Sequence, residues 1–293
     1  MNICVLGAGT IGLSWLRRFV AHGHQVLVCD PRPDLADVVA GLPLTDDERA
    51  RVRVVAERDA ALAEADVVQE SGPEHLAFKR ELIADFARHG RPGAWWFSSS
   101  SALLPSDMSA DAPDEVAARV AIGHPFNPPH LMPLVEVVPG TRTAASTLEA
   151  ARGFYTSLGM EPAVLHREVP GFVGNRLQKA LWAEAFGLVL DGVVSVDDLD
   201  TVMKNSLGLR FACVGIVEAA AMGGGAAGVQ GLMDLLRESF AKIELNDLDW
   251  SNEALAPLYE AAAAAYGAPV DPARITRRDE LLTGMLRVRG QLD

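Results

Sequence analysis

The chain has 293 residues, of which 49% are hydrophobic, so it is long enough to form two domains with buried cores. Its formal net charge of −13 argues against nucleic acid or an anionic membrane as a partner. The three cysteines lack paired spacing, which predicts neither disulfides nor a metal site. We find no signal peptide and no apolar run of membrane length, and therefore expect a cytoplasmic protein.

The first segments predict a strand, a glycine-rich turn, a helix and a second strand. The apolar run at residues 2–6 is followed at once by GAGTIG, residues 7–12, and residues 13–20 carry apolar side chains at helical spacing. A second apolar run, residues 25–29, ends at Asp30. This order is typical of a dinucleotide-binding βαβ unit, in which the pyrophosphate lies at the helix N-terminus.

The glycine turn and the acid that follows it also predict which cofactor binds. A carboxylate at the position of Asp30 accepts hydrogen bonds from the adenosine ribose hydroxyls and repels a 2′-phosphate. Arg32 could favour NADP, but we interpret it as a solvated surface charge between two prolines. We therefore predict NAD. In addition to Asp30, its predicted contacts in the turn are Gly7, Gly9, Thr10, Ile11 and Gly12.

Strands and helices continue to alternate as far as residue 168. Strands are expected at residues 52–55, 66–70, 95–97, 118–122, 134–138 and 163–165, and helices at residues 77–89 and 148–159. Such alternation predicts a parallel, doubly wound sheet with helices on both faces.

After a break at residues 170–171 the pattern becomes helical. Helical spacing covers residues 176–190, 196–204, 228–243 and 254–266. The predicted fold class is α/β, with a Rossmann-type doubly wound sheet domain followed by an all-α C-terminal domain. We expect the NAD-binding domain at residues 1–168 and a helical domain for substrate binding and dimerisation at residues 169–293.

A histidine and a glutamate twelve residues apart are the candidate catalytic pair. His124 lies in the sequence GHPFNPP, residues 123–129, and Glu136 follows in an expected strand. The prolines would fix the turn that presents the imidazole, because proline locks φ and removes a backbone donor. A histidine held by a carboxylate can take a proton from an alcohol while a nicotinamide takes the hydride. The pair therefore predicts an alcohol-oxidising dehydrogenase.

Four motifs in this order resemble the 3-hydroxyacyl-CoA dehydrogenase superfamily over nearly the whole chain. They are GAGTIG with Asp30, the four serines at residues 98–101, GHPFNPP with Glu136, and PGFVGNR at residues 170–176. Residues 98–106, 194–200 and 207–212 are most similar to the branch that contains L-gulonate 3-dehydrogenase and L-carnitine dehydrogenase.

The resemblance implies roles for four side chains. His124 would be the catalytic base and Glu136 its orienting partner, while Ser100 and Asn175 would bind the reacting oxygen. Its neighbours Ser99 and Ser101 carry the same hydroxyl group one residue away, so the identity of the catalytic serine stays open.

The resemblance also implies contacts with cofactor and substrate. Glu74 and Lys79 match positions that touch the cofactor, although an ordinary solvated helix start is an equal alternative, and we place Asn127 among the cofactor contacts. Arg210 would bind a substrate carboxylate, which a guanidinium fork can hold through two hydrogen bonds. A salt bridge at an interface or on the surface is the alternative for Arg210.

Two departures from the acyl-CoA members bear on the substrate. Residues 31–51 are too few for the long helical hairpin that covers CoA in those members. Residues 277–286 predict a charged amphipathic helix in place of a glycine-rich basic segment. Both departures leave CoA few contacts.

We therefore expect NAD-dependent oxidation of a free 3-hydroxy acid, with L-gulonate-like sugar acids favoured. The alternatives are a 3-hydroxyacyl thioester on CoA or a carrier protein, L-carnitine facing Trp182 or Phe186, and a non-enzymatic NAD sensor or structural protein. A homodimer is expected, because the helix at residues 181–190 has more than one apolar face.

Overall fold

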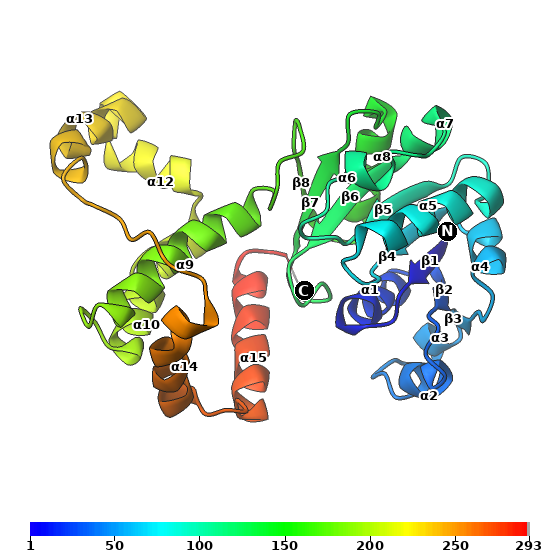
Figure 1. Cartoon of the computed structure of the whole chain (residues 1–293), viewed down its shortest axis with the longest axis horizontal. Coiled ribbons are helices and arrows are strands. Elements are labelled where there is room, and N and C mark those ends of the chain that lie inside the picture. The colour runs from blue at the N-terminus through cyan, green and yellow to red at the C-terminus, as the bar shows by residue number, and fades with distance from the viewer. Residues whose placement is uncertain (292–293) are drawn as a thin grey trace. The chain divides into compact units, whose positions relative to one another are not determined.

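The computed structural model describes residues 1–291 and divides into two compact units, Met1–Asn175 and Arg176–Asp293. The first unit is built on a sheet and the second is helical (Figure 1). This arrangement confirms the predicted fold class. The boundary between the units lies a few residues beyond the expected change at residue 168.

An eight-stranded sheet forms the centre of the first unit, in the order β3-β2-β1-β4-β5-β6-β7-β8. The strands are β1 (Asn2–Leu6), β2 (Gln25–Cys29), β3 (Val52–Val54), β4 (Val67–Glu70), β5 (Trp95–Ser98), β6 (Val120–Pro125), β7 (Leu134–Pro139) and β8 (Glu161–Val164). Strands β1 to β6 run parallel to their neighbours, β7 is antiparallel to β6, and β8 is parallel to β7.

Two apolar clusters fill the two faces of this sheet. Along β1, Ile3 and Val5 join one cluster and Cys4 and Leu6 the other, as the alternation of a strand requires. Burial on both faces explains why the strands appear in the sequence as continuous apolar runs. The helices of the unit are α1 (Thr10–Ala21), α2 (Leu35–Ala40), α3 (Asp46–Arg49), α4 (Arg58–Glu64), α5 (Leu76–His89), α6 (Pro105–Met108), α7 (Asp114–Ala117) and α8 (Ala145–Ser157).

The pairing of β7 with β6 corrects the expectation of a wholly parallel sheet. Residues 126–133 connect the two strands, and a parallel crossover needs about a dozen residues or more. The pairing also extends β6 as far as Pro125, so His124 lies within a strand rather than in the turn that was expected to present it.

The segment between β2 and β3 contains only short helices. Helix α2 has six residues and α3 has four, and a capping box formed by Thr45 and Glu48 begins α3. The expected absence of a long helical hairpin is confirmed.

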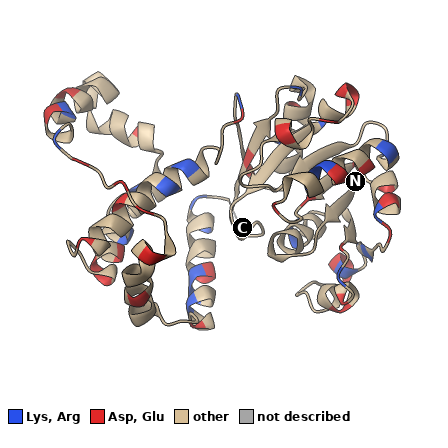
Figure 2. Cartoon of the chain, in the orientation of Figure 1, with Lys and Arg blue, Asp and Glu red and all other residues tan. Residues whose placement is uncertain are grey.

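The second unit exposes much of its apolar surface. Among its described residues, the buried apolar side chains are Leu255, Leu258 and Leu286, whereas Val217 and Leu235 are 72% and 76% exposed. Its helices are α9 (Gly174–Leu190, which begins in the first unit), α10 (Val196–Asn205), α11 (Leu207–Cys213), α12 (Ile216–Gly223), α13 (Gly228–Phe240), α14 (Asn252–Tyr266) and α15 (Pro272–Val288), with a 3₁₀ turn η1 (Gly225–Ala227). Helix α15 carries both basic and acidic residues and includes the expected charged helix (Figure 2).

No single helix within residues 1–291 has the length and apolar composition to cross a bilayer, although the bent pair Val196–Cys213 and Ile216–Gly223 meets both limits when taken together. The expected cytoplasmic location stays a prediction.

Candidate active site

A histidine and a glutamate face each other across two antiparallel strands. His124 of β6 and Glu136 of β7 are direct partners in the ladder, and Nδ1 of His124 lies 2.9 Å from Oε2 of Glu136. Their side chains are 8% and 2% exposed. The bond at Nδ1 fixes the orientation of the ring and leaves Nε2 as the nitrogen that can exchange a proton with a ligand.

The second carboxylate oxygen of Glu136 is bound by the backbone at the start of α9. Oε1 accepts hydrogen bonds of 2.9 Å from the backbone N–H groups of Val173 and Gly174. Burial by itself would raise the pKa of Glu136, but the hydrogen bonds from His124, Gly174 and Val173 outweigh it and lower the pKa. Glu136 is therefore held as an anion that supports a positive charge on the imidazole.

A tight turn places these N–H groups beside the carboxylate. Phe172 is fully buried with a φ of +50°, in the left-handed region that most side chains avoid, and its ring lies 5.6 Å from that of His124. A Cβ added to Gly174 would lie 2.3 Å from the ring of Phe126 and 3.3 Å from Glu136. The PGFVG sequence thus combines a turn with a backbone approach that only glycine permits.

Asn175 follows this turn and reaches the serine loop after β5. Its Nδ2 donates to the backbone oxygen of Ser101 at 3.2 Å. A continuous set of contacts therefore connects His124, through Glu136 and the first residues of α9, with the serines.

The hydroxyls of Ser100 and Ser101 have different surroundings. Ser100 is 2% exposed, and its Oγ donates to Glu74 at 2.7 Å and accepts from the backbone N–H of Leu103 at 2.9 Å. Ser101 is half-buried, and its Oγ has one long contact with Glu74, at 3.5 Å. The hydroxyl of Ser100 is occupied within the loop, whereas that of Ser101 is the less engaged of the two.

Glu74 stabilises the serine loop. Its Oε1 accepts from Ser100 and from the backbone N–H groups of Ser101 and Ala102, at 2.7, 2.8 and 3.1 Å. Burial raises the pKa of Glu74, but the bond from Ser100, the nearby charge of Lys79 and the two backbone bonds lower it overall. Glu74 is thus exposed near the start of α5, while its carboxylate is fixed by these contacts.

Lys79 is 1% exposed and forms an ion pair with an acid that the sequence did not single out. Its Nζ lies 2.9 Å from both carboxylate oxygens of Glu70, which is fully buried, and 3.4 Å from Glu74. Glu70 also accepts from Ser98 Oγ at 2.5 Å and from the backbone N–H of Gly72 at 2.6 Å. Such a buried pair has to satisfy its hydrogen bonds internally. A polar residue at the end of a buried strand was the only sequence signal for Glu70.

The glycine turn fits the pyrophosphate of a dinucleotide. Gly7 has a φ of +99°, and a Cβ there would lie 2.8 Å from the backbone of Ser71, while a Cβ on Gly12 would clash with the Gly7 oxygen. A Cβ on Gly9 would meet no atom within 4 Å. The turn is therefore packed from behind and open at Gly9. The first-turn N–H groups that α1 presents there belong to Thr10, Ile11 and Gly12.

Asp30 stands at the end of β2 with its carboxylate fixed by backbone groups. Oδ2 accepts from Ala8 at 2.7 Å and Oδ1 from the backbone N–H of Arg32 at 2.9 Å. The Arg32 guanidinium binds both oxygens of Asp34, at 2.7 and 3.0 Å. Arg32 is thus a partly exposed surface charge, as the sequence predicted, and it is ion-paired with Asp34.

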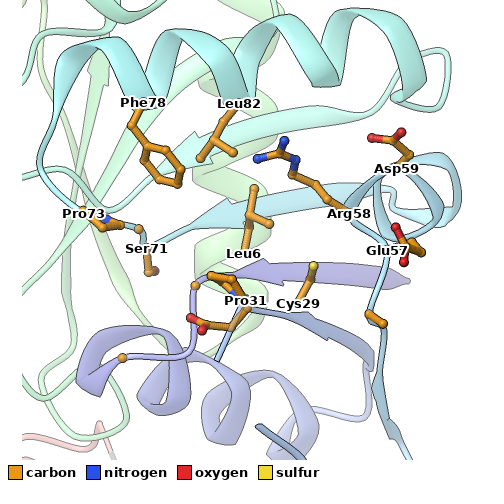
Figure 3. A pocket seen from close by; sticks show the side chains of 15 residues that line it. Leu6, Cys29, Pro31, Glu57, Arg58, Asp59, Ser71, Pro73, Phe78 and Leu82 are labelled. Carbon is orange, nitrogen blue, oxygen red and sulfur yellow. The ribbon is translucent and has the colours of Figure 1, made fainter. Parts of the chain in front are cut away.

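A cavity of about 910 Å³ opens beside the glycine turn and Asp30 (Figure 3). Leu6, Phe78 and Leu82 form apolar parts of its wall. This size and lining are typical of small-molecule sites. The turn, the acid and the cavity together fit the adenosine diphosphate half of NAD.

Two predicted site residues take part in none of the contacts described above. Asn127 is exposed after β6. Arg210 is exposed on α11 in the second unit, and it forms no ion pair with another residue of the described range 1–291. Within the same range, no group of three His, Cys, Asp or Glu side chains could hold a metal ion.

Comparison with known proteins identifies close relatives along the whole chain. A 3-hydroxyacyl-CoA dehydrogenase of Gibberella moniliformis is 36% identical over 310 residues, which cover 99% of this chain and 95% of the relative. An L-carnitine dehydrogenase of Streptomyces griseus is 35% identical over 311 residues, which cover 99% of this chain and 90% of the relative. Both alignments are longer than this chain, so each relative has residues that this chain lacks.

A solved structure has the same fold over the full length. The crystal structure of 5-formyl-3-hydroxy-2-methylpyridine 4-carboxylic acid 5-dehydrogenase, an NAD⁺-dependent dismutase, is similar with a TM-score of 0.82 and 26% identity, and the match covers 100% of this chain and 99% of that one. The family model for the NAD-binding domain of 3-hydroxyacyl-CoA dehydrogenase matches residues 2–169, and the model for the C-terminal domain of that family matches residues 171–250. The chain therefore belongs to the 3-hydroxyacyl-CoA dehydrogenase family and is an NAD-dependent dehydrogenase.

Proposed function

We propose that the chain oxidises the 3-hydroxyl group of a small free 3-hydroxy acid to a ketone. The observation that carries the chemical part of this proposal is the 2.9 Å contact between Nδ1 of His124 and Glu136, with the second oxygen of Glu136 held by two backbone N–H groups. This arrangement favours one tautomer and leaves Nε2 of His124 to accept the hydroxyl proton. NAD, when bound, supplies the hydride acceptor.

Charge develops on His124 and on the reacting oxygen as the proton moves. Glu136 stabilises the imidazolium because it is an anion in direct contact with the ring. We assign binding of the reacting oxygen to Asn175 and Ser101. Ser101 replaces Ser100 in this role, because the hydroxyl of Ser100 already donates to Glu74 and accepts from Leu103.

Three observations favour a free acid over a thioester. The segment between β2 and β3 holds only short helices, which leaves CoA few contacts. Arg210 is an exposed cation without an ion-pair partner in residues 1–291, and a guanidinium suits a carboxylate. The relatives named for L-carnitine and for a pyridine carboxylic acid act on compounds with a free carboxylate.

Two free acids are the leading candidates. An L-gulonate-like sugar acid is the first, because residues 208–210 resemble the GLR motif of the sugar-acid enzymes, whose arginine is placed to bind the substrate carboxylate. L-carnitine is the second, and the L-carnitine dehydrogenases among the relatives favour it. Trp182 and Phe186 of α9 stack with ring centroids 5.8 Å apart, and Trp182 is 43% exposed, so it could face a trimethylammonium group.

Formation of NADH by the purified protein with NAD and either acid tests the proposal. Turnover of L-gulonate above L-carnitine supports the first candidate, and the reverse order supports the second. The free-acid proposal is overturned if L-gulonate, L-carnitine and free 3-hydroxybutyrate are all left unoxidised.

We also propose that the second unit forms a homodimer. Its few buried side chains and its exposed residues Val217, Leu235 and Leu245 need a covering surface, and a second copy provides one through two-fold symmetry. Light scattering should report twice the mass of the chain at micromolar concentration, whereas a monomer would refute the proposal.

A further inference from the structure

A cation lies in the wall of the cavity beside the glycine turn, and no role described above uses it. Arg58 is the first residue of α4 and lines the cavity together with Leu6, Cys29 and Leu82. In Figure 3 its side chain extends toward Leu82 and lies across from Leu6 and Cys29. Glu57 and Asp59 flank Arg58 in the lining of the cavity, and the guanidinium is the basic group at this end.

Two carboxylates on α5 fix the position of this guanidinium. Nη2 of Arg58 lies 2.5 Å from Oδ2 of Asp85 and 3.3 Å from Oε1 of Glu81. The Asp85 side chain is 6% exposed, and Arg88 also contacts it. Both contacts are made by Nη2, so this end of the guanidinium is anchored to α5 before any ligand enters.

Part of the Arg58 side chain remains available for contact with a ligand in the cavity. The Arg58 side chain is 32% exposed, although Nε itself is buried and cannot meet a ligand. A planar guanidinium stacks readily on an aromatic ring and donates hydrogen bonds from its outer nitrogens. A ligand with an aromatic face and ring nitrogen acceptors suits both properties.

The position of the ribose site determines which part of NAD meets Arg58. Asp30 lines the same cavity and has the place of the acid that binds the adenosine ribose. The base joined to that ribose therefore has to enter the space between Leu6, Leu82 and Arg58. Adenine has the aromatic face and the ring nitrogens that this space favours.

We propose that Arg58 is a specificity-determining residue that binds the adenine base of NAD, and that Asp85 is the positioning residue that orients it. The inference concerns only the cofactor and does not depend on which acid is oxidised. It adds Arg58, at the start of α4, to the glycine turn and Asp30 as a group that binds the adenosine half of NAD.

Calorimetric titration of the intact protein with ADP-ribose and, separately, with nicotinamide mononucleotide tests the proposal. For Arg58→Met, the Kd of ADP-ribose should rise by about 5- to 30-fold, because a stacking contact and a hydrogen bond are lost. The Kd of nicotinamide mononucleotide should not change, since it has no adenine. Arg53→Met is the matched control, because Arg53 of β3 is 54% exposed, pairs with Glu64 and does not line the cavity.

The role of Asp85 is tested by a double-mutant cycle. Asp85→Asn should weaken ADP-ribose binding by about threefold when Arg58 is present and should have no further effect in Arg58→Met. Equal losses in both backgrounds would show that Asp85 acts independently of Arg58 and would overturn its positioning role.

Unchanged ADP-ribose affinity in a folded Arg58→Met protein would overturn the proposal. If that variant does not fold, Arg58→Lys decides, because lysine keeps the charge beside Asp85 and lacks the planar group. A Kd at least about threefold above that of the wild type supports the proposal, and a wild-type Kd contradicts it. No substrate is present in these titrations, so their failure is separate from any failure of the proposed reaction.

Discussion

The two units differ in how completely they bury their apolar side chains and pair their polar side chains within one chain. In the first unit two apolar clusters fill the sheet faces, and Glu70, Glu74 and Glu136 each accept several hydrogen bonds. In the second unit most of the large apolar side chains are exposed, and Arg210 has no ion-pair partner among residues 1–291. The cofactor cavity and the pair that we propose for proton transfer thus lie within the first unit, whereas the substrate contact that we propose for Arg210 lies in the second.

Removal of the base should have the largest effect on activity. His124→Ala should lower kcat by about 10²- to 10⁴-fold, because no group remains to take the hydroxyl proton. NAD binding, measured by titration, should change little, since His124 is not in the glycine turn. His166→Ala, which alters an exposed histidine, is the control. Near-native turnover in His124→Ala would show that the base is elsewhere.

The two serines offer a matched pair of changes within one loop. Ser101→Ala should lower kcat by about 10²-fold through the loss of a donor to the reacting oxygen. Ser100→Ala should mainly lower the melting temperature, because it removes the bonds with Glu74 and Leu103. The opposite pattern in kinetics and thermal melts would restore Ser100 as the catalytic serine.

Arg210→Met should separate the contribution of the second unit to substrate binding from the contribution of the first unit to proton transfer. Loss of a charge-assisted pair with a carboxylate should raise KM for a free 3-hydroxy acid by roughly 10- to 150-fold. The kcat should change less, because proton transfer depends on the first unit. Arg237→Met, on an exposed arginine of α13, is the control. A KM unchanged by Arg210→Met would leave the arginine with a surface or interface role.

Glu136→Gln should have a smaller effect, which concerns the stability of the fold and depends on pH. The pKa of Glu136 is lowered in the folded chain, so its stabilisation is fully present above the ordinary value of 4.5 and is lost as pH falls through the folded value. Glu136→Gln should therefore be less stable than the wild type by about 1–3 kcal/mol near neutral pH. The difference in melting temperature should shrink below pH 4.5. A difference that grows in acid would contradict the assignment of Glu136 as a buried anion.

The sequence predicted the parts of the site that depend on short-range patterns. The glycine turn with Asp30 follows from glycine conformation and strand length, and the pairing of His124 with Glu136 follows from their chemistry and spacing. The antiparallel β7 was missed, although the short connection after Pro125 excludes a parallel crossover.

The remaining errors involve long-range contacts between polar groups. Four consecutive serines are equivalent in sequence, and their different bonds to Glu74 and Leu103 distinguish Ser100 from Ser101. Lys79 resembled a solvated residue, because burial beside Glu70 depends on how β4 and α5 pack. Arg58 gave no signal in the sequence for the same reason, since its partners Glu81 and Asp85 are on a different helix.

The most direct test of the central claim compares one acyl group in two chemical forms. Wild-type kcat/KM should be measured with NAD on free 3-hydroxybutyrate and on its CoA thioester. Because this chain lacks the long hairpin and offers an exposed guanidinium, we predict the higher kcat/KM for the free acid. A higher kcat/KM for the thioester, unaltered in Arg210→Met, would contradict the account and identify a 3-hydroxyacyl thioester as the substrate.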